Sequence, residues 1–359
     1  MEMAEQMTQK LIEWYAAKRR ILPWREDPTP YHVWISEIML QQTRVDTVKG
    51  YYARFLASCP DIRALAEAPE DVYMKLWEGL GYYSRVRNMH KAAEEIMTVY
   101  GGEMPGSYAQ LLGITGIGPY TAAAIASIAF GEKVPAVDGN LLRVFARLSA
   151  YPENIKTEKA RKAAAEYYLR WMPEGVSAAA AAHDFYTPGS FNQALMDLGA
   201  TICLPNRAPL CADCPLRDFC TAHARGEETA YPVMPEKKAR RIEDRTVFLI
   251  HDAGKIVIGK RPPKGLLASL YEFPNTEGHL SEADALRYVA GLGIQALRIR
   301  PLPAAKHIFS HIEWRMKGYA VRVGAASAPA GCVWASREQM QDEYTLPGAF
   351  KAYRKRMGL

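Results

Sequence analysis

Two kinds of hydrophobic pattern divide this chain. In the first part Ala, Leu and Met recur at helical spacing, broken at Pro or Gly, around residues 8–19, 45–57, 90–100, 158–171 and 191–200. After about Arg245 apolar and polar residues alternate, as in Ile308–Trp314 and Tyr319–Val323. The pattern predicts an all-α domain over residues 1–225, a linker over 226–244 and a smaller α+β domain over 245–359.

The smaller domain begins with a predicted β-hairpin. Its strands are Thr246–Ile250 and Lys255–Ile258, and Asp252–Gly254 forms the turn between them. Ser281 then begins a helix that runs to about Ala290. This order of elements resembles a Nudix-like fold.

Residues 107–118 read as a helix followed by a glycine-rich hairpin. Ser107, with Gln110 three residues later, forms a capping box that begins the helix. The turn contains Gly113, Gly116 and Gly118, which permit backbone angles that other residues rarely adopt. The chain can therefore turn sharply here and come close to a ligand.

A second helix follows the hairpin. Pro119 suits its first position, and we predict that it runs to Phe130 and stops at Gly131. A hairpin that leads into a helix N-terminus presents free N–H groups to a phosphate. Asp138 lies in the loop behind this helix. A carboxylate behind a phosphate site predicts an enzyme that acts beside a nucleic-acid backbone, whereas the hairpin alone is equally typical of a non-enzymatic DNA-binding module.

A cluster of cysteines predicts a metal site. Four of the six cysteines have the spacing C-x7-C-x2-C-x5-C, namely Cys203, Cys211, Cys214 and Cys220. The chain shows no signal peptide or long apolar run, so we expect a cytosolic protein, in which clustered thiols favour metal over disulfides. The spacing leaves a zinc site and an iron–sulfur cluster both open.

Glu37 is a candidate general acid. Thr29 and Pro30 begin its predicted helix, and Ile35, Ile38, Met39 and Leu40 surround it in sequence. Desolvation raises the pKa of a carboxyl group in such surroundings, as a general acid at neutral pH requires. A surface glutamate on an amphipathic helix is the alternative that this pattern leaves open.

Charge is distributed unevenly along the chain. The net charge is +6, but residues 1–225 carry −1 and the remainder carries +7. Part of the surplus lies in Lys237–Arg241, in the predicted linker after Pro232 and Pro235. Such a run contacts DNA phosphates or is simply a solvated linker, and we favour the DNA contact.

Together these motifs resemble the helix-hairpin-helix, Gly/Pro…Asp superfamily of base-excision DNA glycosylases, and within it the MutY-type adenine DNA glycosylases. The segments Leu22–Arg25, Trp34–Arg44 and Trp77–Asn88 are similar to that family. Related endonuclease III-like enzymes carry a lysine after the hairpin, which forms a Schiff base. This chain has Tyr120 there, which implies a monofunctional glycosylase that removes a base and leaves an abasic site.

The resemblance implies a role for each catalytic residue. Glu37 would protonate adenine N7, and Asp138 would face the sugar as positive charge develops on it, as nucleophile or as electrostatic stabiliser. Tyr120 would form a hydrogen bond near the reacting centre, and Asn140 would orient Asp138 or water.

The resemblance also implies contacts with DNA, the cofactor and the base opposite adenine. A [4Fe–4S] cluster would bind the four cysteines, although the family's usual first gap has six residues and this one has seven. Gln193 stands where some relatives carry glutamate near the adenine. A monovalent cation would bind at the hairpin. The remaining DNA and base contacts are the pocket residues Trp24, Arg25 and Leu80, the duplex-filling Gln42 and Tyr82, the DNA-contacting Thr43, Arg85, Gly116 and Gly118, and the 8-oxoguanine-reading Phe309, Ser310 and His311.

Three other functions are alternatives. A Nudix hydrolase needs several glutamates to hold Mg²⁺, and no such box follows Gly265–Pro274. The second is an iron–sulfur protein that binds mismatches without catalysis. The third is an endonuclease III-type lyase, but this chain lacks the lysine that such an enzyme uses. From the resemblance we expect a monomeric bacterial, nucleoid-associated enzyme with duplex DNA as its partner and no membrane association.

Overall fold

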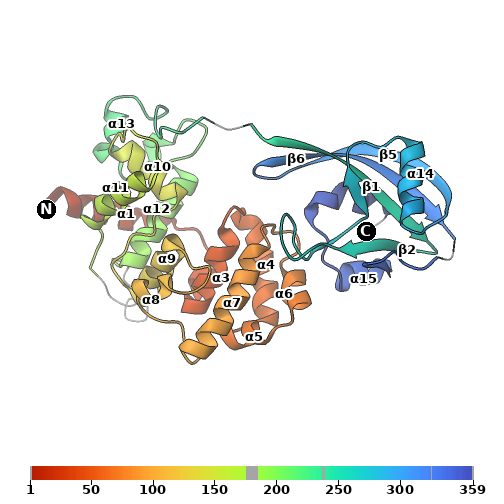
Figure 1. Cartoon of the computed structure of the whole chain (residues 1–359). Coiled ribbons are helices and arrows are strands. Elements are labelled where there is room, and N and C mark those ends of the chain that lie inside the picture. Colours follow the sequence, from red (N-terminus) through yellow and green to blue (C-terminus); the bar gives the residue numbers. More distant parts are fainter. Residues whose placement is uncertain (1, 175–184, 237–238, 325, 358–359) are drawn as a thin grey trace. The chain divides into compact units, whose positions relative to one another are not determined.

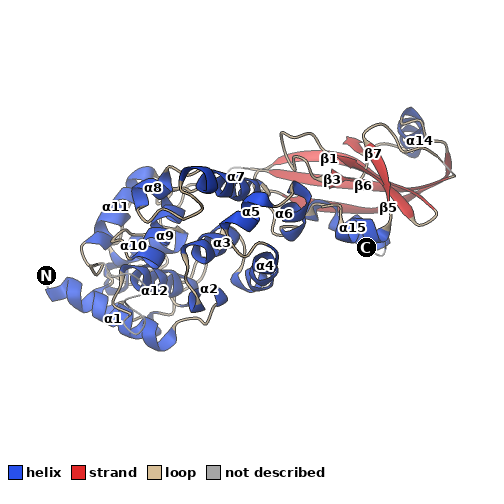
Figure 2. Ribbon diagram, turned by 90° about the horizontal axis from the view of Figure 1, so that it is seen from below, coloured by secondary structure: helices blue, strands red, loops and turns tan. Residues whose placement is uncertain are grey.

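The computed structural model describes residues 2–174, 185–236, 239–324 and 326–357 (Figure 1). Contacts divide the chain into two units, one of residues 1–67 with 88–236 and one of residues 68–87 with 237–359. Helices make up the described part of the first unit, and the second contains the sheet (Figure 2). This confirms the predicted fold class, an all-α domain followed by an α+β domain. Lys237 and Lys238 of the predicted linker lie outside the described residues.

The first unit is built from short and medium helices. Their bounds are α1 Glu2–Lys18, α2 Pro23–Glu26, α3 Pro30–Leu40, α4 Val45–Ser58, α5 Ile62–Glu67, α7 Ser84–Val99, α8 Tyr108–Leu112, α9 Pro119–Phe130, α10 Gly139–Leu148, α11 Glu158–Leu169, α12 Pro188–Thr201 and α13 Thr221–Ala224, with 3-10 turns at Cys211–Asp213 and Arg217–Phe219. The unit boundary falls inside α7. Among the described residues no helix has the length and apolarity needed to cross a bilayer.

The hairpin between α8 and α9 forms largely as predicted. Ser107 accepts a hydrogen bond from the Gln110 N–H, Pro119 is the first residue of α9, and Gly131 ends it at φ 72°. Only Gly116 of the three turn glycines has a positive φ, 76°, and a Cβ there would lie 2.7 Å from Asn88 Cβ. The prediction was wrong for the other two, since Gly113 (φ −75°) and Gly118 (φ −87°) adopt angles open to any residue.

Close packing of α12 on α10 places the start of α10. A Cβ on Gly199 would lie 2.6 Å from Asn140 Cβ, so only glycine permits this approach. Asp138 caps α10, its side chain accepting from the N–H groups of Asn140 and Leu141. The carboxylate is therefore fixed by the same hydrogen bonds that begin the helix.

The second unit contains a seven-stranded mixed sheet. Its strands are β1 Arg241–Asp252, β2 Lys255–Lys260, β3 Tyr271–Glu272, β4 Asn275–Glu277, β5 Ala296–Ile308, β6 Ile312–Val323 and β7 Cys332–Ala335. The order is β3-β2-β1-β6-β5, with β4 also paired to β1 and β7 to β2. The β1–β6 pair is parallel, and the other pairs are antiparallel. The predicted hairpin is present as β1–β2, and β1 begins earlier than expected because its first residues pair with the start of β6.

Two hydrophobic cores cover the two faces of this sheet. One packs Phe248, Ile250 and Val321 against Val289 of α14, Glu282–Gly291, which Ser281 caps as predicted. The other packs Trp314 and neighbouring side chains against the remaining helices. These are α15 Arg337–Asp342 and α16 Lys351–Arg354, with 3-10 turns at Gly348–Phe350 and Lys355–Met357, while α6 Glu70–Leu76 also belongs to this unit.

Candidate active site

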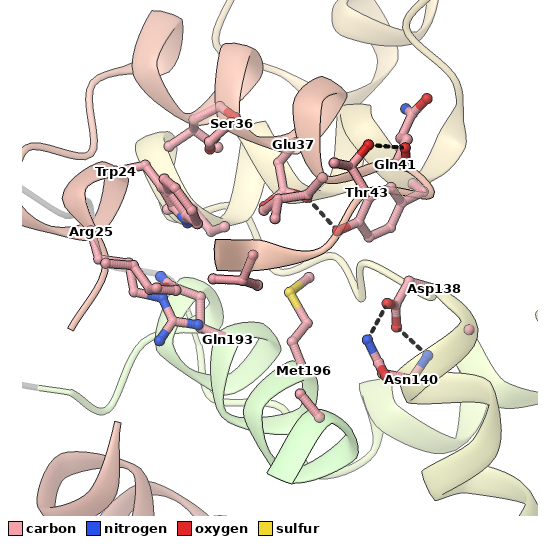
Figure 3. Close-up of a pocket in the computed structure, with 18 of the residues that line it drawn as sticks. Trp24, Arg25, Ser36, Glu37, Gln41, Thr43, Asp138, Asn140, Gln193 and Met196 are labelled. Atoms are coloured by element: carbon pink, nitrogen blue, oxygen red, sulfur yellow. Dashed lines mark hydrogen bonds between the residues drawn. The ribbon is translucent and has the colours of Figure 1, made fainter. Parts of the chain in front are cut away.

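The first unit contains a cavity of about 580 Å³ that brings together nine of the predicted site residues, including all four predicted catalytic ones. Figure 3 shows side chains from α3, α10 and α12 directed toward it. Its lining includes the predicted residues Trp24, Arg25, Glu37, Gln42, Thr43, Tyr120, Asp138, Asn140 and Gln193. Residues far apart in sequence therefore share one pocket of the size that binds a small ring system.

Glu37 lies in an apolar wall of this cavity. Only 6% of its surface is exposed, and burial raises the pKa of its carboxyl group to about 7. The nearby Asp138 carboxylate raises the pKa further, while a hydrogen bond from the Tyr120 hydroxyl to Glu37 Oε2 and the charge of Arg25 act against the rise. A carboxyl group in this environment exchanges a proton near neutral pH.

Asp138 sits among hydrogen-bond donors instead. Its Oδ1 accepts from the N–H groups of Asn140 and Leu141 at 2.8 Å each, and Asn140 Nδ2 donates to its Oδ2 at 2.8 Å. Burial raises the pKa of Asp138, and these three donors and Arg143 oppose that rise. The donors stabilise the ionised form of Asp138 by direct hydrogen bonds.

Arg143 holds this arrangement in place and was not among the predicted site residues. Its Nη2 donates to Asn140 Oδ1 at 2.9 Å and to Gly199 O at 2.7 Å, and its Nε donates to Cys203 O at 2.7 Å. Only 8% of the residue is exposed. One guanidinium therefore links Asn140 to the first residue of the cysteine cluster.

An ion-pair cluster around Asp197 contributes Arg20 and Arg25 to the cavity wall, and of these three residues only Arg25 was predicted. Asp197, 1% exposed, accepts from Arg25 Nη1 at 2.8 Å and Nη2 at 2.9 Å, and from Arg20 Nε at 2.7 Å. Although burial alone would raise it, the pKa of Asp197 is held below its usual value by these two arginines. A helical aspartate four residues after Gln193 was the available signal, because residues at this spacing share a helix face.

The two predicted duplex-filling residues share an unusual backbone conformation. Gln42 has φ 58° and Tyr82 has φ 47°, values that cost free energy for residues other than glycine. Both side chains are exposed, Tyr82 by 47%. Exposed residues with a backbone conformation of this kind are typical of binding sites.

Leu80 and Arg85, which lie beside Tyr82, are both buried. Leu80 is 6% exposed. Arg85 is 9% exposed and donates to the carbonyl oxygens of Leu80 and Gly81, at 3.1 Å each. Burial lowers the pKa of Arg85 to about 10. Its guanidinium therefore supports the loop that carries Tyr82 and does not face outward to DNA.

In the second unit, Phe309–His311 forms the turn between β5 and β6. The Phe309 ring packs edge-on against Trp314, with centroids 5.1 Å apart. Ser310 Oγ lies 2.6 Å from the Tyr82 hydroxyl, and both line a cavity of about 590 Å³ with His311 and Lys264. The structure thus brings the predicted lesion-reading turn next to a predicted duplex-filling residue of the same unit.

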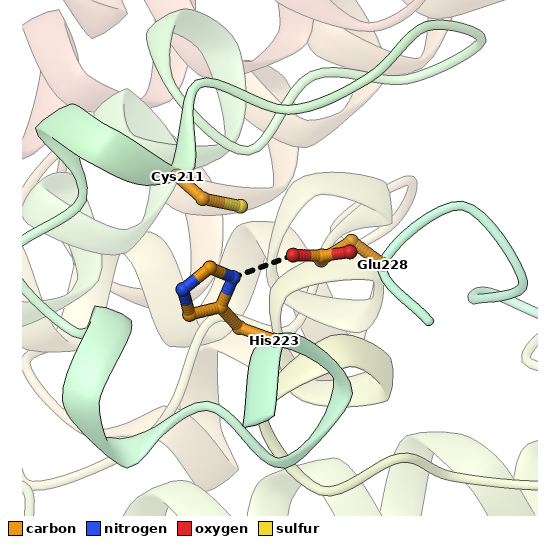
Figure 4. A group of neighbouring side chains, drawn as sticks. All are labelled: Cys211, His223 and Glu228. Atoms are coloured by element: carbon orange, nitrogen blue, oxygen red, sulfur yellow. Dashed lines mark hydrogen bonds and ion pairs between the residues drawn. The ribbon is translucent and has the colours of Figure 1, made fainter. Parts of the chain in front are cut away.

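The four clustered cysteines line one small cavity together. None of the four forms a disulfide, and Arg147 Nη1 lies 3.2 Å from Cys203 Sγ. His223 and Glu228 form an ion pair beside Cys211 (Figure 4), and these three groups would also fit a metal ion. Four converging soft thiols fit an iron–sulfur cluster or zinc.

Gly116 and Gly118 lie at the start of α9. No side chain caps this helix, so its first N–H groups have no side-chain acceptor among the described residues. Such N–H groups form an anion site at a helix N-terminus.

Comparison with known proteins gives consistent matches over the chain. A family model described as HhH-GPD superfamily base excision DNA repair protein matches residues 35–170, and a NUDIX domain model matches residues 246–356. The adenine DNA glycosylase of Mus musculus is 33% identical over 96% of this chain and 76% of its own length. That of Buchnera aphidicola is 34% identical over 85% of this chain and 82% of its own length. A thermostable thymine-DNA glycosylase structure, 27% identical, superposes with a TM-score of 0.54 over 62% of this chain and 98% of its own.

Proposed function

Because the chain belongs to the adenine DNA glycosylase family, we propose that it removes adenine mispaired with 8-oxoguanine, or with guanine, from duplex DNA. It acts in base excision repair and leaves an abasic site. The observation that carries the proposal is the pairing of Glu37, whose pKa is about 7, with Asp138 in one cavity. Adenine must leave the base stack to reach this cavity, which costs a few kcal/mol.

The two carboxyl groups act in sequence in this proposal. Glu37 donates its proton to adenine N7, which makes the base a better leaving group. Asp138, whose ionised form the donors of α10 favour, stabilises the positive charge that develops on the sugar. Glu37, now deprotonated, activates the water that attacks the sugar. Tyr120, which donates to Glu37, and Asn140, which donates to Asp138, keep both groups aligned.

Lesion recognition is assigned to the second unit. Ser310 and His311 offer hydrogen bonds to the groups that distinguish 8-oxoguanine from guanine, and Phe309 packs beside them. Tyr82 and Gln42 fill the duplex beside the lesion and at the vacated position. Ser310→Ala with His311→Ala should reduce the ratio of excision rates, 8-oxoguanine over guanine, by about tenfold, the equivalent of one or two hydrogen bonds. An unchanged ratio would remove this turn from recognition.

The four cysteines are proposed to hold a [4Fe–4S] cluster. When bound, the cluster cross-links the loop from Cys203 to Cys220 behind α10. Arg147 donates toward Cys203, and Arg143 connects the Cys203 carbonyl to Asn140. Iron and acid-labile sulfide in the purified protein, lost together in Cys214→Ser, would support this assignment; zinc in their place would contradict it.

A single-turnover assay on a labelled duplex with adenine opposite 8-oxoguanine tests the function. Alkali afterwards cleaves the strand at any abasic site. We expect cleavage only after alkali, and a loss of about 10³-fold in Glu37→Gln because a general acid contributes 10²–10⁴. Glu67→Gln, an exposed glutamate of the same unit, is the matched control and should retain full activity. Intact DNA with the unaltered protein, despite binding, would leave a mismatch-binding protein.

A further inference from the structure

Tyr15 lies next to the catalytic cavity and forms a hydrogen bond with one of its lining residues, Gln193. It lies on α1 and is 2% exposed. Its hydroxyl donates to Gln193 Oε1 on α12 at 3.1 Å. Gln193 lines the catalytic cavity, whereas Tyr15 does not. Tyr15 therefore contacts a residue of the catalytic cavity without lining that cavity itself.

The position of the Tyr15 hydroxyl is fixed by its surroundings. The Arg25 guanidinium lies 5.5 Å from the centre of the ring, and Phe185 packs edge-on at 5.9 Å. Arg25 is in turn held by both oxygens of Asp197. Burial raises the pKa of Tyr15, so the hydroxyl keeps its proton and remains a donor at neutral pH.

A donor fixed in this way orients the amide of Gln193. The carbonyl end of the amide is directed to Tyr15, and Nε2 donates to none of the residues that the structure describes. A side-chain amide has an acceptor at one end and two donors at the other. The group left for a ligand in the cavity is therefore the NH₂ of Gln193.

We propose that Tyr15 is a positioning residue that makes Gln193 a hydrogen-bond donor to the flipped base, so that the site reads a ring nitrogen and not the 6-amino group. This inference rests on the proposed function, because it concerns the base held in the same cavity. Adenine offers ring nitrogens as acceptors and its amino group as a donor. An ionised glutamate at position 193 can only accept, and would pair with the amino group.

The test compares two bases opposite 8-oxoguanine, adenine and purine, which has hydrogen in place of the amino group. Single-turnover excision is measured for the unaltered protein, Gln193→Glu and Tyr15→Phe, and the readout is the purine-to-adenine rate ratio within each protein. A purely structural defect lowers both rates and leaves this ratio unchanged. Tyr31→Phe is the matched control, since that buried hydroxyl donates to Cys59 O at 2.8 Å, away from the cavity.

We expect the ratio to fall about 100-fold in Gln193→Glu, because a site built to pair with the amino group rejects a base without it. In Tyr15→Phe the freed amide can turn its carbonyl to the amino group, and the ratio should fall about fivefold, the equivalent of one hydrogen bond. Tyr31→Phe should leave it unchanged. Normal adenine excision with an unmoved ratio in both variants would overturn this inference alone. Failure of the unaltered protein to remove adenine would overturn the proposed function and this inference with it.

Discussion

Glu37 and Asp138 line the same cavity, yet their environments differ in kind. Glu37 projects from the middle of α3 into an apolar wall and receives one hydrogen bond, from Tyr120. Asp138 stands at the N-terminus of α10 and receives three. Burial acts on both groups, but only Asp138 has a set of donors to oppose it.

The difference shows how one cavity can treat two carboxyl groups differently: burial raises the pKa of both, but the donors around Asp138 favour its ionised form. Position in a helix decides it, because a mid-helix side chain finds no free backbone donors, whereas an N-cap side chain finds two or three. An acid and an anion are the two groups that cleavage of a glycosidic bond requires.

The largest expected effect comes from removing the charge of Asp138. Asp138→Asn keeps a good N-cap but loses the negative charge, so single-turnover excision should fall by about 10³-fold while the thermal midpoint stays close to that of the unaltered protein. Asp218→Asn, an exposed aspartate of the same unit, controls for the substitution itself. Excision at the normal rate would show that Asp138 is only a helix cap.

Unlike Asp138, Glu37 should lower the free energy of unfolding when it is ionised. Its pKa is about 7 in the folded protein against 4.5 unfolded, so the folded state binds more protons between these values and stability falls as pH rises through them. Glu37→Gln should therefore stabilise the fold by about 3 kcal/mol at pH 8 and by little at pH 4. Urea unfolding at both pH values measures this difference. An equal effect at both would mean that burial does not hold Glu37 protonated.

A substitution of Arg143 tests whether its guanidinium group supports Asp138 through Asn140. Arg143→Lys keeps the charge but cannot reach Asn140, Gly199 and Cys203 together, so excision should fall about tenfold, as for loss of a charge-assisted hydrogen bond. Arg161→Lys, at another arginine of the cavity lining, is the control. Equal activity in both variants would mean that the fork of Arg143 does not matter.

The smallest expected effect concerns the single donor to Glu37. Tyr120→Phe removes the hydrogen bond that lowers the pKa of Glu37, so that pKa should rise and excision should persist to higher pH. The rate at pH 7 should fall only about fivefold, as for one neutral hydrogen bond. A pH profile displaced to lower pH would reverse the assigned role.

Local features of the site were predictable from the sequence, and long-range ones were not. The apolar surroundings of Glu37 are its own helical neighbours, and Pro119 and Gly131 mark the ends of α9 directly. Arg143 and Tyr15, in contrast, make hydrogen bonds to residues 60 and 178 positions away along the chain. No local pattern reports such contacts, because packing of whole helices creates them.

The turn glycines and the segment 68–87 also show that long-range packing could not be predicted from local sequence. Gly116 needs its positive φ, but Gly113 and Gly118 do not, and composition alone cannot distinguish them. The helical segment 68–87 groups with the β-sheet unit through contacts such as Lys75 Nζ to Met340 O at 3.1 Å and Arg87 to the Ala268 carbonyl. Its helical pattern gave no sign of that partner.

Burial raises the pKa of Glu37 to about 7 and so allows it to act as the acid near neutral pH. The most direct measurement is the single-turnover rate on adenine opposite 8-oxoguanine as a function of pH, for the unaltered protein and Glu37→Gln. We predict a rate that declines as pH rises through about 7, and a residual Glu37→Gln rate without that decline. A decline near pH 7 that survives in Glu37→Gln, or a flat profile in the unaltered protein, would contradict the role of Glu37 as the acid.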